Sequence, residues 1–393
     1  MIPLSKAEAY VLECALPMSS TEQVGLWESL GRVLATDISS DMNMPPFDKS
    51  AVDGYACRKE DLDANLKVVE VIPAGQMANM EITQGLCSKI MTGAPVPKGA
   101  NCVIMVEEVE EVDEQTIRFT GKYSKTNIAI FAEDVKEGDK VLSKGVIIEP
   151  QHIAILSAVG VSNVTVSVRP KVSILVTGDE LVEVSEKPNV GQIRNSNGHQ
   201  LYSQVIRSGA IPVYIGIVDD TESATETAIV NALSQSDIVV LTGGVSMGDF
   251  DYVPKVLNGL GIDIKFQTIA VQPGKPTLFG VKGKQLVFGL PGNPVSSLFQ
   301  FDLLVRTAIL RLMGGSSAQR ELLKMPIAHD YKRKRSERLA LVPAKVNGNG
   351  EVELLSYHGS AHIFALAQAQ LMVIVPIGVS QLKKGDLVNV RSV

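Results

Sequence analysis

The middle of the chain alternates short apolar runs with amphipathic stretches, and this alternation predicts a sheet with helices packed on it. The runs with strand character are rich in β-branched residues, and the stretches between them repeat apolar positions every three to four residues. The expected strands lie at 171–178, 212–220, 237–244, 262–271 and 285–292, and the expected helices at 199–209, 221–236, 251–261 and 295–315. Repeated βαβ units of this kind predict an α/β domain with a mostly parallel sheet.

The flanking segments follow another pattern, in which short β-branched runs are separated by turns rich in Gly, Pro and Asp. This pattern predicts β-rich structure on both sides of the α/β domain. The domains we expect are an N-terminal helix packed on the α/β domain (1–20), a small linking domain (21–41 and 141–169), a β-rich lid domain (42–140), the α/β domain itself (170–322) and a C-terminal β-barrel-like domain (323–393).

Composition narrows the class of protein. The 393 residues are 45% hydrophobic and 20% charged, which is typical of a soluble globular chain with several cores. No apolar run approaches the roughly 18 to 20 residues that span a bilayer, and the N-terminus does not have the pattern of a signal peptide. We therefore expect a cytoplasmic protein that does not act on membranes, and the net charge of −6 argues against nucleic acid as its partner.

Two features of composition concern possible ligands. The four cysteines show no C-x-x-C spacing and lie in apolar contexts, so structural thiols are expected rather than a zinc site or disulfides. The basic run YKRKRSER at 331–338 has two interpretations, a solvated hinge between domains or an anion-binding segment.

Polar residues collect where the predicted parallel strands end, and this is the edge at which ligands bind in doubly wound sheets. Glycines allow close approach of the backbone, and helix N-termini offer free N–H groups to an anion. Carboxylates repel an anion, so their presence here implies a bridging cation, most simply Mg²⁺, or groups that transfer protons. The strand-end residues concerned are Asp179, Glu180, Asp219, Asp220, Gly243, Gly244, Ser246, Asp249, Asp251, Asn293, Ser296 and Ser297.

Three further stretches carry candidate chemistry. Lys275 lies in PGKPT (273–277), where two prolines stiffen the loop and make this lysine a candidate anion contact. In the β-rich region, Asp48 and Asp53 interrupt PPFDKSAVDGYA, and a turn fixed by Gly and Pro presents Thr92. Their rigidity and polarity favour a lid over a pocket rather than a mobile linker.

Six motifs together resemble a known family. PPFDKSAVDGYA, IMTGAPVPKGA, ILVTGDEL, LTGGVSMGDFDYV, QPGKPTLFG and LPGNPVSS occur in the order and approximate spacing of the molybdopterin molybdenumtransferases, the MoeA type that includes the E domain of gephyrin. The resemblance covers nearly the whole chain.

This resemblance implies an elongated four-part subunit and a homodimer in which the lid of one subunit covers the α/β crevice of the other. It implies an enzyme of molybdenum cofactor biosynthesis that inserts molybdate into adenylylated molybdopterin, releases AMP and uses Mg²⁺. The molybdopterin adenylyltransferase is a candidate partner.

Carried over by motif, the implied catalytic residues are Asp53, Thr92, Asp134, Glu180, Asp219 and Asp251, with Asp219 and Asp251 also as metal ligands. The implied substrate-binding residues are Gly243, Gly244, Ser246, Lys275, Pro276, Pro291, Asn293, Pro294, Ser296 and Ser360.

The chain departs from the family pattern at several positions. Gln272 replaces a lysine found in many members, and an arginine expected near Pro343 is absent, with Arg338 as a candidate substitute. Residues 130–132, Ile-Phe-Ala, stand where basic residues and a glycine often precede the Glu-Asp pair, and residues 369–371 replace the usual Ala-Asn-Gly ending. Two other functions remain open on the same architecture, a molybdopterin adenylyltransferase and a non-enzymatic dimeric scaffold of the gephyrin kind.

Overall fold

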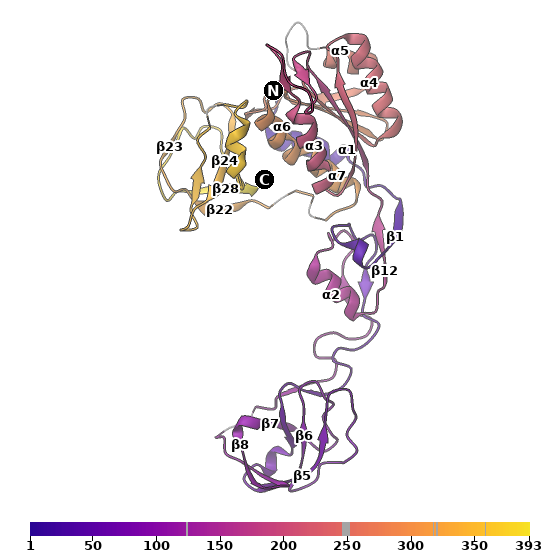
Figure 1. The fold of residues 1–393 in the computed structure, drawn as a ribbon, viewed down its shortest axis with the longest axis vertical. Coiled ribbons are helices and arrows are strands. Elements are labelled where there is room, and N and C mark those ends of the chain that lie inside the picture. The colour runs from indigo at the N-terminus through magenta and orange to yellow at the C-terminus, as the bar shows by residue number, and fades with distance from the viewer. Residues whose placement is uncertain (123–124, 246–251, 317, 320, 358) are drawn as a thin grey trace. The chain divides into compact units, whose positions relative to one another are not determined.

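The computed structural model describes residues 1–122, 125–245, 252–316, 318–319, 321–357 and 359–393 (Figure 1). The chain forms two compact units. The larger unit contains Met1–Thr36, Lys144–Glu149 and Asn163–Val393, and the smaller unit contains Asp37–Ser143 and Pro150–Ser162.

A six-stranded sheet forms the centre of the larger unit, in the order β16-β13-β17-β21-β20-β18. The first four strands are parallel, and β20 and β18 add an antiparallel edge. The strands are β13 (Lys171–Thr177), β16 (Ile211–Val218), β17 (Ile238–Thr242), β18 (Asp263–Phe266), β20 (Leu278–Lys282) and β21 (Gln285–Leu290). The predicted α/β domain is thus present, although β20 was not among the predicted strands.

Helices cover both faces of this sheet. Successive residues of a strand point to opposite faces, so strands that are apolar throughout present apolar side chains on both faces, and both must be covered. In β17, Val240 packs into one hydrophobic core and its neighbours Val239 and Leu241 pack into another. The first core includes side chains of α1 (Leu4–Cys14), α3 (Ser196–Arg207), α6 (Pro294–Gln300) and α7 (Arg306–Leu312). The second includes side chains of α4 (Glu222–Gln235) and α5 (Val253–Gly259).

The long apolar helix predicted at 295–315 is interrupted. A π-helical turn, η4 (Phe301–Val305), lies between α6 and α7. Such turns shift the hydrogen-bond register by one residue and occur often at functional sites. Here the turn follows directly on Gln300, which is fully buried.

A second sheet makes up the C-terminal module, in the order β19-β24-β26-β28-β22, with β25 paired to β24. Its strands are β19 (Val271–Gln272), β22 (Leu323–Pro326), β24 (Leu339–Val346), β25 (Val352–Leu354), β26 (Leu371–Val375) and β28 (Leu387–Ser392). β19 lies parallel to β24, so the single strand predicted at 262–271 is in fact two strands in two different sheets. Residues 273–277 therefore join the C-terminal sheet to the central one.

Short elements complete the larger unit. β1 pairs antiparallel with β12, and β14 pairs parallel with β15. The remaining elements of this unit are β1 (Thr21–Gly25), η1 (Trp27–Ser29), β12 (Asn163–Ser167), β14 (Leu181–Val182), β15 (Ile193–Arg194), β23 (Tyr331–Lys332), η5 (Ile363–Gln368) and β27 (Gln381–Leu382).

The smaller unit is β-rich, as predicted, around a sheet in the order β7-β4-β6-β5-β9-β8. Its elements are β2 (Ile38–Ser39), β3 (Lys49–Ser50), β4 (Gly54–Cys57), η2 (Lys59–Asp61), β5 (Asn65–Ile72), β6 (Leu86–Ile90), β7 (Cys102–Met105), η3 (Val106–Glu108), β8 (Val109–Asp113), β9 (Thr116–Phe119), β10 (Ile128–Ala129), β11 (Lys140–Leu142) and α2 (Pro150–Ala158). Cys57, Cys87 and Cys102 are thiols outside any disulfide and are buried in its core. Burial raises the pKa of the Cys87 thiol to about 12, so this thiol is unreactive at neutral pH.

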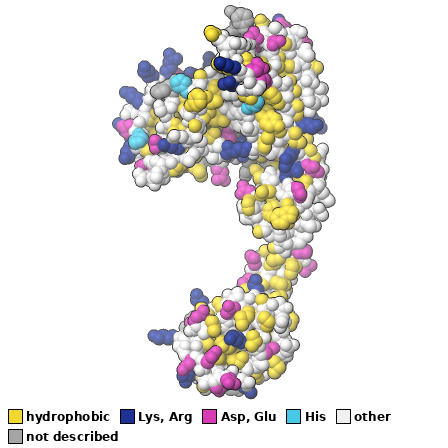
Figure 2. Space-filling view, in the orientation of Figure 1, with side chains coloured by type: hydrophobic (Ala, Val, Ile, Leu, Met, Phe, Trp, Pro, Cys, Tyr) yellow, Lys and Arg dark blue, Asp and Glu magenta, His cyan; other side chains and the backbone are white. Residues whose placement is uncertain are grey.

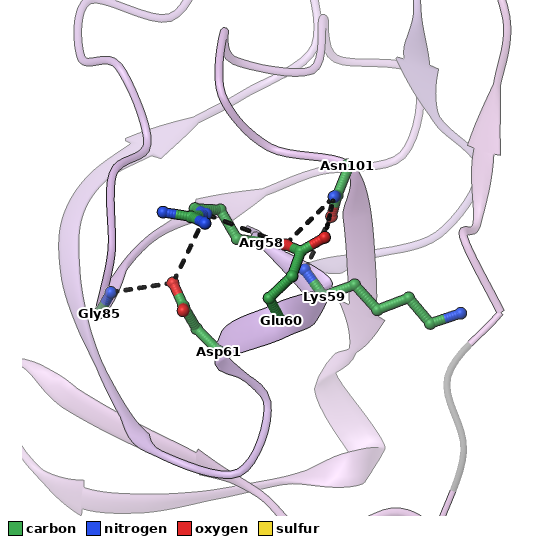
Figure 3. A network of polar contacts seen from close by, with 6 residues as sticks. All are labelled: Arg58, Lys59, Glu60, Asp61, Gly85 and Asn101. Atoms are coloured by element: carbon green, nitrogen blue, oxygen red, sulfur yellow. Dashed lines mark hydrogen bonds and ion pairs between the residues drawn. The ribbon is translucent and has the colours of Figure 1, made fainter.

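A polar network fixes the turn that follows β4 (Figure 3). The backbone N–H of Lys59 donates to Asn101 Oδ1 at 2.7 Å, and Asn101 Nδ2 donates to Glu60 Oε1 at 3.0 Å. The backbone N–H of Gly85 donates to Asp61 Oδ2 at 3.0 Å. Because Asn101 and Gly85 immediately precede β7 and β6, the network ties the ends of three neighbouring strands together.

Ala132 has a backbone conformation that favours glycine, with φ of +59°. It occupies the third position of a turn closed by the hydrogen bond from Glu133 N to Ile130 O at 3.1 Å, where glycine avoids the clash of a Cβ atom. We expect Ala132→Gly to stabilise the smaller unit by about 0.5–1 kcal/mol. The midpoint of urea unfolding should be higher for Ala132→Gly than for the wild type. It should not rise for Ala132→Ser, because serine keeps a Cβ atom. A lower midpoint for Ala132→Gly would show that the turn is not strained.

Candidate functional site

A cavity of about 880 Å³ opens where the parallel strands of the central sheet end. We call it the strand-end cavity. Its walls come from the segments that follow β13, β16, β17 and β21, from the N-terminus of α3, and from the C-terminal module. Its lining residues include Gly178, Glu180, Arg194, Asn195, Asn197, Asp220, Thr242, Gly243, Gly244, Pro276, Pro291, Gly292, Asn293, Pro294 and Phe364.

Asn197 holds three walls of the strand-end cavity together. Its side-chain Nδ2 donates to Thr242 Oγ1 at 3.0 Å and to the carbonyl oxygen of Gly292 at 2.7 Å. Thr242 Oγ1 in turn donates to the carbonyl of Pro291 at 3.1 Å. One buried amide therefore fixes the start of α3 against the ends of β17 and β21.

The turn after β17 requires glycine. Gly243 has φ of +94°, and a Cβ atom added there would lie 2.3 Å from the carbonyl oxygen of Thr177. Gly244 has φ of +60°, and its Cβ would lie 3.0 Å from Thr177 Oγ1. The two residues let the backbone of this turn lie close to β13 and leave the cavity open above it.

Carboxylates stand close together at one side of the strand-end cavity. The backbone N–H of Asp220 donates to Asp179 Oδ1 at 3.1 Å. Burial raises the pKa of the Asp220 carboxyl above its ordinary value, and the nearby charges of Asp179 and Glu180 raise it further. A cation placed there would lower the repulsion between these groups.

A second cavity, of about 1200 Å³, lies between the loop 272–277 and the C-terminal module. We call it the cationic cavity. Its cationic lining residues are Lys275, Lys332, Arg333, Lys334, Arg335 and Arg338. No Asp or Glu occurs among the described residues that line it. Figure 2 shows the corresponding concentration of Lys and Arg over the C-terminal module.

The basic segment 331–338 is held in place by one of its own arginines. Arg333 donates from Nε to Val379 O at 2.7 Å, from Nη1 to Arg338 O at 2.8 Å, and from Nη2 to Pro376 O at 2.6 Å. Arg338 Nη1 donates to Val271 O at 3.3 Å. These hydrogen bonds tie the segment to the C-terminal module, where it lines the cationic cavity, and they favour the anion-binding interpretation.

The two cavities share a wall. Pro276, Pro291 and Asn293 line both, and Lys275 lines the cationic cavity beside them. Ser296 and Ser360 also line the cationic cavity, and the carbonyl of Ser360 accepts a hydrogen bond from Val295 N at 3.1 Å. A molecule in the strand-end cavity and an anion in the cationic cavity would thus lie on either side of residues 275–276.

In the smaller unit the structure brings Asp53 and Thr92 together. Asp53 Oδ1 accepts hydrogen bonds from Thr92 N at 2.7 Å and from Thr92 Oγ1 at 2.9 Å. These donors, the backbone N–H first, lower the pKa of the exposed Asp53 carboxyl. Asp134 lies in another loop of the same unit, where its backbone N–H donates to Met44 O at 3.0 Å.

The structure places the other predicted site residues as follows. Glu180, Gly243, Gly244 and Pro294 line the strand-end cavity, and Lys275, Ser296 and Ser360 line the cationic one. Ser246, Asp249 and Asp251 lie outside the described residues. Asp219 is exposed and is not among the described lining residues of either cavity, whereas its neighbour Asp220 lines the first.

Several lining residues were not predicted as site residues. Asn195 and Asn197 were missed because N-caps and first-turn asparagines look like ordinary helix starts, and Asn195 does cap α3 through Gly198 N at 2.9 Å. Arg194 is the only cation among the described residues lining the strand-end cavity. Phe364, 91% exposed, lies at its edge and carries no sequence signal beyond being a lone aromatic residue.

Among the described residues, no group of three or more His, Cys, Asp or Glu side chains is arranged to hold a metal ion. In the same part of the chain, every helix is too short or too polar to cross a membrane.

Comparisons with known proteins agree with this architecture along the whole chain. Residues 2–160 match the family described as MoeA N-terminal region (domain I and II). Residues 173–311 match the family described as Probable molybdopterin binding domain, and residues 326–393 match the MoeA C-terminal region (domain IV).

Individual relatives are similar over nearly their full length. The molybdopterin molybdenumtransferase of Staphylococcus epidermidis is 34% identical over 378 residues, covering 93% of this chain and 90% of the relative. The Bacillus subtilis enzyme of the same name is 33% identical over 385 residues, covering 94% and 89%. The crystal structure of the molybdopterin biosynthesis MoeA protein from Pyrococcus horikoshii OT3 superposes with a TM-score of 0.85 at 32% identity and covers 100% of both chains.

The central sheet, its strand-end cavity and these matches define a protein with a molybdopterin-binding α/β domain. The chain belongs to the MoeA-type molybdopterin molybdenumtransferase family and has the mixed α/β fold of that family. The family resemblance inferred from the six sequence motifs is confirmed.

Proposed function

We propose that this chain is a molybdopterin molybdenumtransferase that takes adenylylated molybdopterin and molybdate as substrates and releases AMP. It acts in molybdenum cofactor biosynthesis and transfers molybdenum into molybdopterin. The proposal that adenylylated molybdopterin and molybdate are the two substrates rests on a pair of adjoining cavities. One is at the strand ends and the other is lined by cations, and they share a wall at Pro276, Pro291 and Asn293.

The strand-end cavity suits the organic substrate. Its volume of about 880 Å³ is within the range of small-molecule sites. Gly243 and Gly244 bring backbone to the cavity surface without side chains, as phosphate-binding turns do. Arg194 supplies a positive charge for a phosphoanhydride, and the exposed ring of Phe364 supplies a flat apolar surface. These features support binding of adenylylated molybdopterin there.

The cationic cavity suits molybdate. An oxyanion needs donors and positive charge, and the described lining residues offer Lys275, Arg338 and Ser296 with no carboxylate to repel it. The neighbouring basic residues of 332–335 would attract the anion toward this site. They also supply charge close to Gln272, where many family members carry a lysine.

The carboxylates of the strand-end cavity fit a magnesium ion. Mg²⁺ is usually held by one or two carboxylates together with substrate phosphates, so a group of three protein ligands is not required. Glu180 and Asp220 are the described residues that would hold it, and the direction of the Asp220 pKa, raised first by burial and then by the charges of Asp179 and Glu180, supports this proposal. When bound, the ion would neutralise charge that develops on the phosphoanhydride. Asp219 and Asp251 stay predictions as ligands.

We also propose that the chain works as a homodimer. Large apolar side chains are exposed near its N-terminus, with Leu16 65%, Trp27 82% and Leu30 53% accessible in the isolated chain. The molar mass measured by multi-angle light scattering should be about twice the chain mass of 42.2 kDa. A molar mass equal to that of one chain would contradict the homodimer proposal.

AMP release tests the proposed reaction. Purified protein incubated with adenylylated molybdopterin should release AMP only when molybdate and a divalent cation are both present. The physical reason is that the carboxylates and the anions repel one another without a cation between them. Full turnover in excess chelator would contradict the magnesium proposal. Consumption of ATP with free molybdopterin would instead indicate an adenylyltransferase.

A further inference from the structure

The wall between the two cavities depends on a small number of contacts from beneath it. Part of this wall is the loop 273–277, which carries Lys275 and Pro276 and has no regular secondary structure. Thr277 Oγ1 donates to the carbonyl of Gly274 at 2.7 Å, and Gln300 Nε2 donates to the carbonyl of Pro273 at 3.2 Å. Both side chains are fully buried. The carbonyls just before Lys275 are thus fixed by two residues that line neither cavity.

Gln300 reaches the loop from the last residue of α6. Residues four apart in a helix lie on the same face, so Gln300 shares its face of α6 with Ser296, which lines the cationic cavity. This face of α6 therefore supports the loop through Gln300 and contributes Ser296 to the cavity. The π-helical turn begins at the next residue, Phe301.

The loop is shaped to accept the Gln300 amide. Gly274 has φ of +107°, and a Cβ atom there would lie 2.3 Å from Gln300 Nε2. Glycine at 274 therefore serves two purposes: it allows the left-handed turn and leaves space for the amide. The contact is one of direct packing as well as of hydrogen bonding.

The glutamine at this position combines one hydrogen bond to the loop with one polar atom left unpaired by the described residues. Gln300 Oε1 is buried and has no hydrogen-bond partner among the described residues. An unpaired buried acceptor costs about 1–3 kcal/mol, a cost that a methionine of similar length would avoid. The hydrogen bond that Gln300 does make is the one to the loop that carries Lys275.

We propose that Gln300 is a positioning residue for the oxyanion site, because it fixes the Pro273–Gly274 backbone and so directs Lys275 into the cationic cavity. The inference rests on the proposed function of that cavity as the molybdate site. Gln300 does not touch the substrate in this account. It acts through Lys275 alone.

A double-mutant cycle tests this directly. Molybdate binding is measured by calorimetry on the full-length protein, and the molybdate KM and kcat are measured by AMP release. Gln300→Met should weaken molybdate binding about tenfold and raise KM by a similar factor, with a smaller change in kcat. In a Lys275→Ala background, Gln300→Met should cause no further loss, because its effect passes through the lysine that is already absent.

Gln204 provides a matched control. It is a glutamine of α3 whose Nε2 donates to Leu298 O at 3.1 Å and whose Oε1 is also buried without a described partner, but it does not line either cavity. Gln204→Met removes the same kind of hydrogen bond and should leave molybdate affinity unchanged. Gln300→Leu, which also removes the donor, provides a second test if Gln300→Met does not fold.

The outcomes separate this inference from the proposed function. If Lys275→Ala weakens molybdate binding and neither Gln300 variant does, the positioning role is wrong and the oxyanion site stands. Additive losses in the double mutant, or an equal loss in Gln204→Met, would show that Gln300 is merely structural. If neither Lys275→Ala nor the Gln300 variants change molybdate binding, the cationic cavity is not the oxyanion site and Gln300 has no positioning role in it.

Discussion

Lys275→Ala is expected to raise the molybdate concentration needed for half-maximal AMP release by about 10- to 100-fold. A hydrogen bond between a charged donor and an oxyanion contributes about 1.5–3 kcal/mol, and no Asp or Glu is among the described residues that line the cationic cavity with this lysine. The effect should appear mainly in the KM for molybdate, since the site proposed for the organic substrate is on the other side of the wall.

Two variants give this experiment its controls. Lys275→Arg keeps the charge and should retain most of the molybdate affinity. Lys282→Ala removes an exposed lysine at the end of β20 that lines neither cavity, and should behave as wild type. A Lys275→Ala protein with unchanged molybdate KM, or an equal loss in Lys282→Ala, would show that the oxyanion does not bind at this wall.

Asp220→Asn should have opposite effects on activity and on stability. If Asp220 holds the assisting cation, AMP release should fall by about 100-fold or more. Its carboxyl has a pKa raised above 3.8 by burial and by the charges of Asp179 and Glu180. A raised folded-state pKa stabilises the fold at low pH, and this contribution is lost as the pH rises through that value. The neutral amide should therefore raise the melting temperature at pH 7, with the difference shrinking as the pH falls toward 4.

Thermal melts with and without Mg²⁺ provide a readout that does not depend on turnover. Magnesium should raise the melting temperature of the wild type and should have less effect on Asp220→Asn, because binding to the folded state stabilises it. Asp219→Asn is the matched comparison, since it changes the adjacent carboxylate, which is exposed. If Asp219→Asn abolished the magnesium effect and Asp220→Asn did not, the cation would belong to Asp219, as the motif comparison first indicated.

The central sheet could be predicted from the sequence because buried parallel strands read as continuous apolar runs. The run ending at Leu241 is an example, with every residue of β17 buried. The predicted strand at 262–271 shows the limit of this signal. Its apolar residues are divided between β18 in the central sheet and β19 in the C-terminal sheet, and an apolar run does not encode which sheet it joins.

The candidate site was predictable where backbone chemistry determines it. Gly243 and Gly244 mark a turn that only glycine adopts easily, and PGKPT marks a stiff loop. It was not predictable that Asp220 rather than Asp219 would line the strand-end cavity, because the path of the chain after a strand decides which of two adjacent side chains faces it. The contact of Gln300 with Pro273 joins residues far apart in the sequence, so no local pattern could indicate it.

The central claim is that two adjoining cavities bind the two substrates. The most direct test of it is diffraction from crystals grown with molybdate and AMP. The anomalous signal of molybdenum should lie in the cationic cavity, within hydrogen-bonding distance of Lys275 and Ser296, and the nucleotide should lie in the strand-end cavity against Gly243 and Gly244. Molybdenum in the strand-end cavity, or bound only on the outer surface of the basic segment, would contradict the account.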